Sequence, residues 1–180
     1  MISKKYPFLF LDRDGVINER LPGQYVKTKE DFVFMPGALQ TFSQLAKRTT
    51  RIIIVTNQQG VGKEIMTYDE LDQVHTHMQA QIEEHGGRVD AIYSCTELET
   101  DKSNCRKPSP AMGIWAKMRF PELDFARALM VGDSVSDILF GKHLGMKTVL
   151  FEGKLEEKNA LSKLKPDYSI KNFAKIVDIL

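Results

Sequence analysis

Acidic side chains follow two of the short apolar runs in this sequence. Asp12 and Asp14 come after the first run, and Asp133 and Asp137 come after a later one. One acidic pair by itself is as typical of a helix cap or a solvated turn as of a functional site. Asp12 and Asp14 are two positions apart, however, so in extended backbone their side chains point the same way, toward one pocket.

Two further polar clusters carry groups that complement the carboxylates. Thr56, Asn57 and Gln58 follow another apolar run, and Arg106 and Lys107 precede a predicted helix. The threonine hydroxyl and the backbone N–H groups after it suit an anion, and the lysine places a point charge beside phosphoryl oxygens. The arginine offers a planar fork for a second phosphate or a carboxylate.

Phosphoryl transfer accounts for this combination of groups. A carboxylate can attack phosphorus and form an aspartyl-phosphate, provided that the charge on the phosphoryl oxygens is neutralised. Mg²⁺ prefers one or two carboxylates together with substrate and water oxygens, and Asp12 and Asp133 can supply those carboxylates. Asp14 can protonate the leaving oxygen and later activate water. The sequence therefore predicts a magnesium-dependent phosphatase with Asp12 as its nucleophile.

Continuous apolar runs between polar turns are typical of strands that are buried on both faces. These runs are Phe8–Leu11, Ile52–Val55, Ala128–Val131, Thr148–Phe151 and the weaker Val89–Tyr93. Helical patterns lie between or after them, over residues 37–47, from Thr67 to Gly86, from Ser109 to Phe120, and over residues 135–144 and 171–179. Residues 152–166 are charged, and we expect them to be solvated.

This alternation predicts an α/β fold, namely a three-layer, doubly wound, Rossmann-like parallel sheet with helices on both faces. Thr67 and Glu70 form a capping-box pattern at the start of one helix. In such a fold, ligands bind at the carboxyl ends of the strands. We therefore expect the polar clusters to meet at that edge.

Length and charge indicate a soluble protein with a small ligand. A chain of 180 residues fits one domain, residues 1–180. Lys and Arg total 25 against 24 for Asp and Glu, so no net field favours nucleic acid or a membrane surface. The first apolar run is too short for a signal peptide, and no segment approaches the ~20 apolar residues of a bilayer span. We expect a cytoplasmic monomer or weak homo-oligomer.

The four polar clusters resemble the motifs of the haloacid dehalogenase (HAD) superfamily of phosphatases. Those motifs are an aspartate pair flanking one residue, a serine or threonine after the second strand, a lysine, and an acidic pair in a glycine-aspartate context. The resemblance runs from Phe8 to Phe151. It is strongest to the capless subfamily III branch that holds D-glycero-D-manno-heptose 1,7-bisphosphate phosphatases and histidinol phosphatases, over residues 12–18, 55–58 and 105–108.

This resemblance implies roles for the clustered residues. Asp12 would be the nucleophile and Asp14 the acid/base, and Mg²⁺ would be held by Asp12, the backbone carbonyl of Asp14 and Asp133. The other residues would bind the phosphoryl group or the rest of the substrate, or support these contacts: Thr56, Asn57, Gln58, Lys107, Arg106 and Asp137. The implied reaction in carbohydrate metabolism is removal of the 7-phosphate of a heptose bisphosphate. Histidinol phosphate and other small sugar phosphates are alternative substrates.

Two segments depart from that branch. Its zinc-binding members carry Cys-x-His and Cys-x-Cys, whereas here Cys95 is followed by Glu97, and Ser103 precedes Cys105. Two of the four ligands that a structural zinc needs are absent. We therefore expect no structural zinc and two leftover thiols, although Glu97 or a distant residue offers a substitute ligand. The loop of residues 19–25 also differs from the substrate loop of heptose enzymes, which leaves the substrate open.

Two other functions remain as alternatives. One is a receiver-type module that keeps phosphate on an aspartate, but such a module has no use for an acid/base such as Asp14. The other is a nucleic-acid 3′-phosphatase, which a capless site permits and which the near-zero net charge opposes.

Several further patterns favour structural readings. The run Gly60–Lys63 lacks the first glycine and the final Ser or Thr of a nucleotide-binding loop. His75 and His77 are two apart on a predicted helix, so they point to different faces and should be partly exposed. Methionine and tryptophan residues at helical spacing are expected in the core, namely Met112, Trp115 and Met118.

Overall fold

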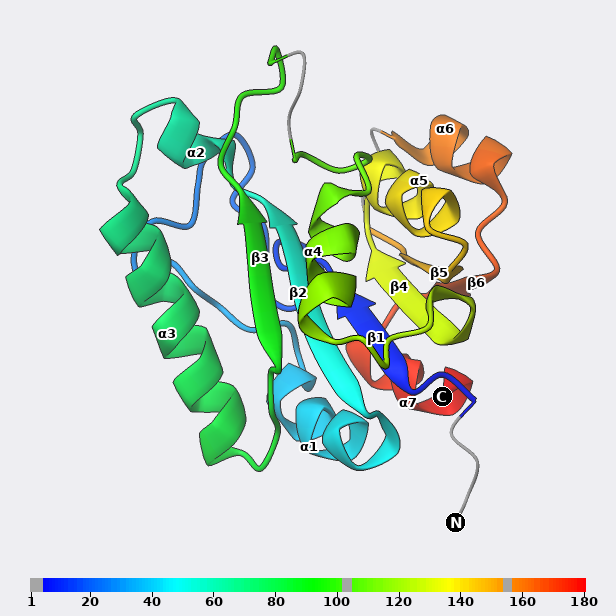
Figure 1. Ribbon diagram of the computed structural model, residues 1–180. Coiled ribbons are helices and arrows are strands. Elements are labelled where there is room, and N and C mark those ends of the chain that lie inside the picture. The colour runs from blue at the N-terminus through cyan, green and yellow to red at the C-terminus, as the bar shows by residue number, and fades with distance from the viewer. Residues whose placement is uncertain (1–4, 102–104, 154–156) are drawn as a thin grey trace.

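The computed structural model describes residues 5–101, 105–153 and 157–180, and its centre is a parallel sheet (Figure 1). The six strands stand in the order β3-β2-β1-β4-β5-β6. Their bounds are Phe8–Leu11 (β1), Arg51–Asn57 (β2), Ala91–Cys95 (β3), Ala128–Gly132 (β4), Lys147–Phe151 (β5) and Tyr168–Ile170 (β6). All neighbouring pairs are parallel. The predicted doubly wound sheet is confirmed.

Helices cover both faces of this sheet. Their bounds are Ala38–Arg48 (α1), Gln59–Gly62 (α2), Tyr68–Glu84 (α3), Ala111–Arg119 (α4), Val135–His143 (α5), Lys158–Leu164 (α6) and Ile176–Ile179 (α7). Short 3₁₀ turns span Phe125–Arg127 and Phe173–Lys175. Helices α1, α3 and α7 pack on one face, and α4 and α5 pack on the other (Figure 1).

Strand β1 illustrates why these sequences are apolar throughout. Leu9 and Leu11 point into the core on the α1/α3 side, while Phe8 and Phe10 point into the core on the α4/α5 side. Because successive side chains of a strand alternate between faces, a strand covered on both sides needs apolar residues at every position. No helix among the described residues is both long and apolar enough to cross a membrane.

The predicted capping box of α3 is confirmed. The Thr67 hydroxyl accepts a hydrogen bond from the Glu70 backbone N–H at 3.1 Å, and the Glu70 carboxylate accepts one from the Thr67 backbone N–H at 2.6 Å. A second capping box, not predicted, opens α5. There the Asp137 carboxylate accepts from the Ser134 backbone N–H at 3.0 Å. These bonds satisfy backbone donors that the first turn of each helix leaves unpaired.

Most of the residues that the structure describes within the expected solvated stretch are exposed, and part of the stretch is helical. Helix α6 lies within residues 152–166 and buries Leu161, and β6 follows it on the edge of the sheet. Helix α6 was not predicted, because charged residues dominate that stretch of the sequence. Helix α2 was also not predicted.

The expected core role of the methionine and tryptophan pattern on α4 is wrong for two of its three residues. Met112 is fully buried, but Trp115 is 43% and Met118 is 75% exposed. A repeat of three residues falls short of the 3.6-residue helical turn, so the stripe drifts off the buried face. Met112 and Ala116, which are four apart, pack on the sheet instead.

Candidate active site

The predicted site residues meet where the order of the strands reverses. From the central strand β1 the chain continues to β2 on one side, and β4 pairs with β1 on the other side. Asp12 follows β1, Thr56 lies at the end of β2, and Asp133 follows β4. Such a switch point leaves a crevice at the carboxyl ends of the strands, which is the usual ligand site of this architecture.

Two adjoining cavities occupy that crevice. The first has a volume of about 360 Å³, and its lining includes Asp12, Asp14, Thr56, Asn57, Arg106, Lys107 and Asp137. The second is about 930 Å³ and includes Gln58 and Asp133 in its lining, together with the loop of residues 19–26. Asp14, Arg20 and Asn57 line both cavities. The predicted residues therefore lie around one continuous depression.

Lys107 is the buried cation of the first cavity. Its Nζ lies 2.8 Å from Asp12 Oδ1 and 2.6 Å from Asp137 Oδ1, and it donates to the Val55 carbonyl at 2.7 Å. Burial opposes the charge on Lys107, but the two carboxylates outweigh burial and raise its pKa. The ammonium is therefore held charged and directed at the predicted nucleophile.

Asn57 holds the backbone of Lys107 in place. Its side-chain carbonyl accepts from the Lys107 N–H at 2.9 Å, and its amide donates to the Lys107 carbonyl at 3.2 Å. Both ends of the Asn57 amide thus position the lysine. The predicted contact of Asn57 with a phosphoryl group stays a prediction.

Asp12 is buried among other acids. Its carboxylate, like those of Asp133 and Asp137, has an oxygen within 4.8 Å of the others, and all three residues are buried. Burial and the charge of Asp137 raise the pKa of Asp12 to about 6, although Lys107 acts in the opposite direction. Concentrated negative charge of this kind suits a hard divalent cation with oxygen ligands.

Arg20 contacts two of the predicted Mg²⁺ ligands. Its Nε lies 3.0 Å from Asp133 Oδ2 and 3.3 Å from the backbone carbonyl oxygen of Asp14. Gly15 makes this close arrangement feasible, because it has a φ of 88° and a Cβ there would lie 2.2 Å from Asp133 Oδ2. These oxygen donors fit Mg²⁺, which would share them with the guanidinium.

Asp14 is held by three neighbouring side chains. Arg13 donates to both of its carboxylate oxygens at 2.9 Å, Asn18 donates at 2.9 Å, and Gln58 donates at 2.7 Å. Burial favours the neutral acid, but the charge of Arg13 and these hydrogen bonds outweigh burial and lower the pKa of Asp14. Gln58 also donates to the Thr56 hydroxyl at 2.8 Å, so it links two predicted site residues.

Sequence reasoning missed several members of this constellation. Arg13, Asn18 and Arg20 all contact Asp14, and His75 lies against Arg13. The expected partial exposure of His75 is wrong, since it is only 7% exposed. Arg13 had a signal, because it stands between the two predicted aspartates, whereas His75 had none, since its partner Arg13 is distant in the sequence.

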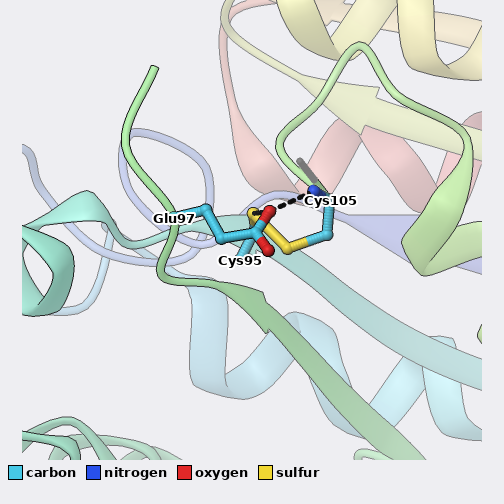
Figure 2. Close-up of side chains that lie close together, drawn as sticks. All are labelled: Cys95, Glu97 and Cys105. Atoms are coloured by element: carbon cyan, nitrogen blue, oxygen red, sulfur yellow. Dashed lines mark hydrogen bonds between the residues drawn. A yellow bond between two sulfur atoms is a disulfide. The ribbon is translucent and has the colours of Figure 1, made fainter. Parts of the chain in front are cut away.

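The two cysteines are paired, which corrects the expectation of leftover thiols (Figure 2). Cys95 ends β3 and forms a disulfide with Cys105, with their Cα atoms 5.4 Å apart. The Glu97 carboxylate accepts a hydrogen bond from the Cys105 backbone N–H at 2.6 Å. The chain leaves β3 and returns to the same point just before Arg106 and Lys107, which brings the two sulfurs together.

Known proteins share this arrangement. A HAD-hydrolase-like family model matches residues 104–176. The D-glycero-alpha-D-manno-heptose-1,7-bisphosphate 7-phosphatase of Mycobacterium bovis is 37% identical over 130 residues, which are 72% of this chain and 68% of that protein. The D-glycero-beta-D-manno-heptose-1,7-bisphosphate 7-phosphatase of Helicobacter pylori strain 26695 is 30% identical over 173 residues, 96% of each chain.

Structural similarity leads to the same group. The crystal structure of D,D-heptose 1,7-bisphosphate phosphatase from B. bronchiseptica, complexed with magnesium and phosphate, aligns with a TM-score of 0.86 and 28% identity. The alignment covers 96% of this chain and 97% of that one. This chain is therefore a phosphatase and belongs to the HAD superfamily, in the group of the heptose 1,7-bisphosphate phosphatases.

Proposed function

We propose that this phosphatase removes the 7-phosphate of D-glycero-D-manno-heptose 1,7-bisphosphate in a magnesium-dependent reaction. The observation that carries the proposal is the position of Asp12, buried at the switch point, 2.8 Å from the Lys107 ammonium and beside two further carboxylates. The relatives named above supply the substrate class. Residues 1–180 would act as one capless domain, since the described parts of the connections between β1, β2 and β4 hold loops, helices α1 to α4, a 3₁₀ turn and β3.

The first half of the reaction transfers the phosphoryl group to Asp12. A carboxylate oxygen of Asp12 attacks phosphorus, the ester P–O bond breaks, and the leaving alkoxide takes the proton of Asp14. The negative charge of a bound phosphate raises the pKa of the adjacent Asp14, which favours the protonated form that this step needs. Lys107 neutralises charge on the phosphoryl oxygens.

The second half regenerates the enzyme. Asp14, now a carboxylate, takes a proton from water as the water oxygen attacks phosphorus. The P–O bond to Asp12 breaks, which releases inorganic phosphate and restores the Asp12 carboxylate. The hydrogen bonds from Arg13, Asn18 and Gln58 favour the carboxylate form of Asp14 that acts here.

Asp12, Asp133 and the Asp14 carbonyl would hold Mg²⁺. The bound ion would neutralise charge on the transferring phosphoryl group. Asp137 would help to hold Lys107 in place, because its carboxylate caps α5 and pairs with the Lys107 ammonium.

The substrate assignment rests on the cavities as well as on the relatives. Arg106 lines the cavity that holds Asp12 and Lys107, and its guanidinium suits the second phosphate of a bisphosphate. The relatives include enzymes for both the α and the β anomer. The anomer is therefore the finer point for experiment to decide.

A phosphate-release assay with Mg²⁺ tests the proposal. The panel contains both heptose 1,7-bisphosphate anomers, histidinol phosphate and simple sugar phosphates. We expect the highest kcat/KM for one heptose anomer and no turnover by Asp12→Asn. Magnesium-dependent turnover retained by Asp12→Asn would contradict the nucleophile, and a preference for another phosphate would contradict the substrate alone.

A further inference from the structure

A buried arginine and histidine lie behind Asp14, on the side away from the cavity. Arg13 is fully buried, although it carries a permanent charge. Its Nε and Nη2 donate to the Asp14 carboxylate, and its Nη1 lies 3.1 Å from Nε2 of His75. His75 comes from α3, more than 60 positions away along the chain. The three residues form a continuous path of polar contacts from the helix to the predicted acid/base.

The direction of the Arg13–His75 hydrogen bond follows from chemistry. A guanidinium has only donors, so Nε2 of His75 must be the acceptor. The imidazole is therefore neutral and carries its proton on Nδ1. Burial and the charge of Arg13 favour this same state, because they lower the pKa of His75 to about 3.

We propose that His75 is a positioning residue for phosphoryl transfer, which acts through Arg13 to hold the Asp14 carboxylate in its working orientation. The inference rests on the proposed role of Asp14 as the acid/base. Arg13 can hold Asp14 with a two-pronged contact only while its guanidinium plane is fixed. His75 fixes that plane from the opposite side, because it binds the nitrogen that Asp14 does not contact.

Loss of the histidine acceptor would have a specific consequence. A buried Nη1–H without a partner is costly, so the guanidinium would turn toward another acceptor or toward water. That rotation changes the hydrogen bonds to Asp14. Proton transfer depends on such geometry, and a shift of about 1 Å costs up to ~100-fold in rate.

The experiment compares His75→Ala, His75→Gln and the control His77→Ala. The Gln side-chain oxygen can take the place of Nε2 as an acceptor, so His75→Gln is the rescue variant. His77 lies on the same helix and makes an edge contact with Phe32, with ring centres 6.3 Å apart. The His77→Ala variant therefore tests the general effect of removing an imidazole from α3.

The readout is the first turnover, measured with two kinds of substrate. An alkyl phosphate has a poor leaving group that needs a proton from Asp14, whereas 4-nitrophenyl phosphate has a good one that does not. For His75→Ala we expect about a 10- to 100-fold slower first turnover of the alkyl phosphate and less than about a threefold change for 4-nitrophenyl phosphate. KM should stay within about twofold. His75→Gln should lie within about threefold of wild type, and His77→Ala should match it.

Several outcomes would overturn the inference. An equal loss on both substrates would give His75 a purely structural role, and wild-type rates for His75→Ala would give it none. ¹⁵N NMR of the wild-type protein adds a readout independent of activity and of any variant that fails to fold. A neutral His75 protonated on Nδ1 at pH 5 supports the proposal, and a charged ring or the other tautomer contradicts it. A wild-type enzyme that hydrolyses no phosphomonoester would instead refute the proposed function.

Discussion

Replacing Asp12 with asparagine should stabilise the metal-free protein while it abolishes turnover. The Asp12 carboxylate is buried with those of Asp133 and Asp137, each within 4.8 Å of the others. Asparagine keeps the shape of the side chain, and its carbonyl can still accept a hydrogen bond from Lys107. Lys107 also retains Asp137 at 2.6 Å. The substitution therefore removes one negative charge from the cluster and leaves little unsatisfied.

The magnitude follows from the electrostatics of the site. The pKa of Asp12 rises from 3.8 to about 6 in the folded protein. Each pKa unit corresponds to about 1.4 kcal/mol, so ionised Asp12 lowers the free energy of unfolding by about 3 kcal/mol at neutral pH. The folded state binds this proton more tightly than the unfolded chain. The cost is therefore absent below about pH 4 and complete above about pH 6.

Urea denaturation in EDTA, followed by circular dichroism, measures the difference. We expect Asp12→Asn to exceed wild type by about 1 to 3 kcal/mol at neutral pH and by much less near pH 4. Added Mg²⁺ should narrow the gap, because it binds the folded wild type more tightly. Asp178→Asn, at an exposed ion pair, is the control and should change little. An Asp12→Asn protein no more stable than wild type at neutral pH would refute the reasoning.

Three other perturbations have defined outcomes. Arg20→Ala should tighten Mg²⁺ binding in calorimetry by up to about fivefold, because Arg20 competes for Asp133; weaker binding would contradict this competition. Since the folded pKa of His75 lies near 3 rather than 6.5, wild type should lose up to about 5 kcal/mol of stability as pH falls through that window. His75→Gln should not show this loss of stability at acid pH, and urea unfolding midpoints of both proteins measured as a function of pH will test the difference. Reduction of the Cys95–Cys105 disulfide should cost about 2.7 kcal/mol by loop closure, and dithiothreitol should not affect the stability of a Cys95→Ser/Cys105→Ser protein.

Local patterns were sufficient to predict most of the sheet. β1 was predicted at its observed bounds, Phe8–Leu11, because both of its faces are buried and every residue is apolar. β6 was missed, since a three-residue edge strand carries almost no pattern. The weaker run at Val89–Tyr93 was placed two residues early at each end relative to β3, whose middle residues are only partly buried.

The positions of the site residues could be predicted from the sequence, whereas several of their contacts could not. The predicted residues follow strand ends, and a parallel sheet brings strand ends together whatever the detailed packing. Some contacts that set their electrostatics are local, such as those of Arg13 and Asn18 with Asp14, but others join residues that no local pattern pairs. Arg13 with His75, Asn57 with Lys107 and the disulfide each needed the three-dimensional structure, since no periodicity marks such pairs.

The charges of the buried aspartate cluster and its two cationic partners give a reason for a metal ion in the proposed reaction. Asp12, Asp133 and Asp137 carry three negative charges, and Lys107 and Arg20 carry two positive ones, which leaves one net negative charge. Asp14 does not alter this balance, because Arg13 neutralises it. A phosphate dianion beside this cluster would meet repulsion from its carboxylates. A divalent cation held by the same carboxylates would reverse the net charge of this cluster, so that the group of acids that destabilises the metal-free protein would help to bind the substrate.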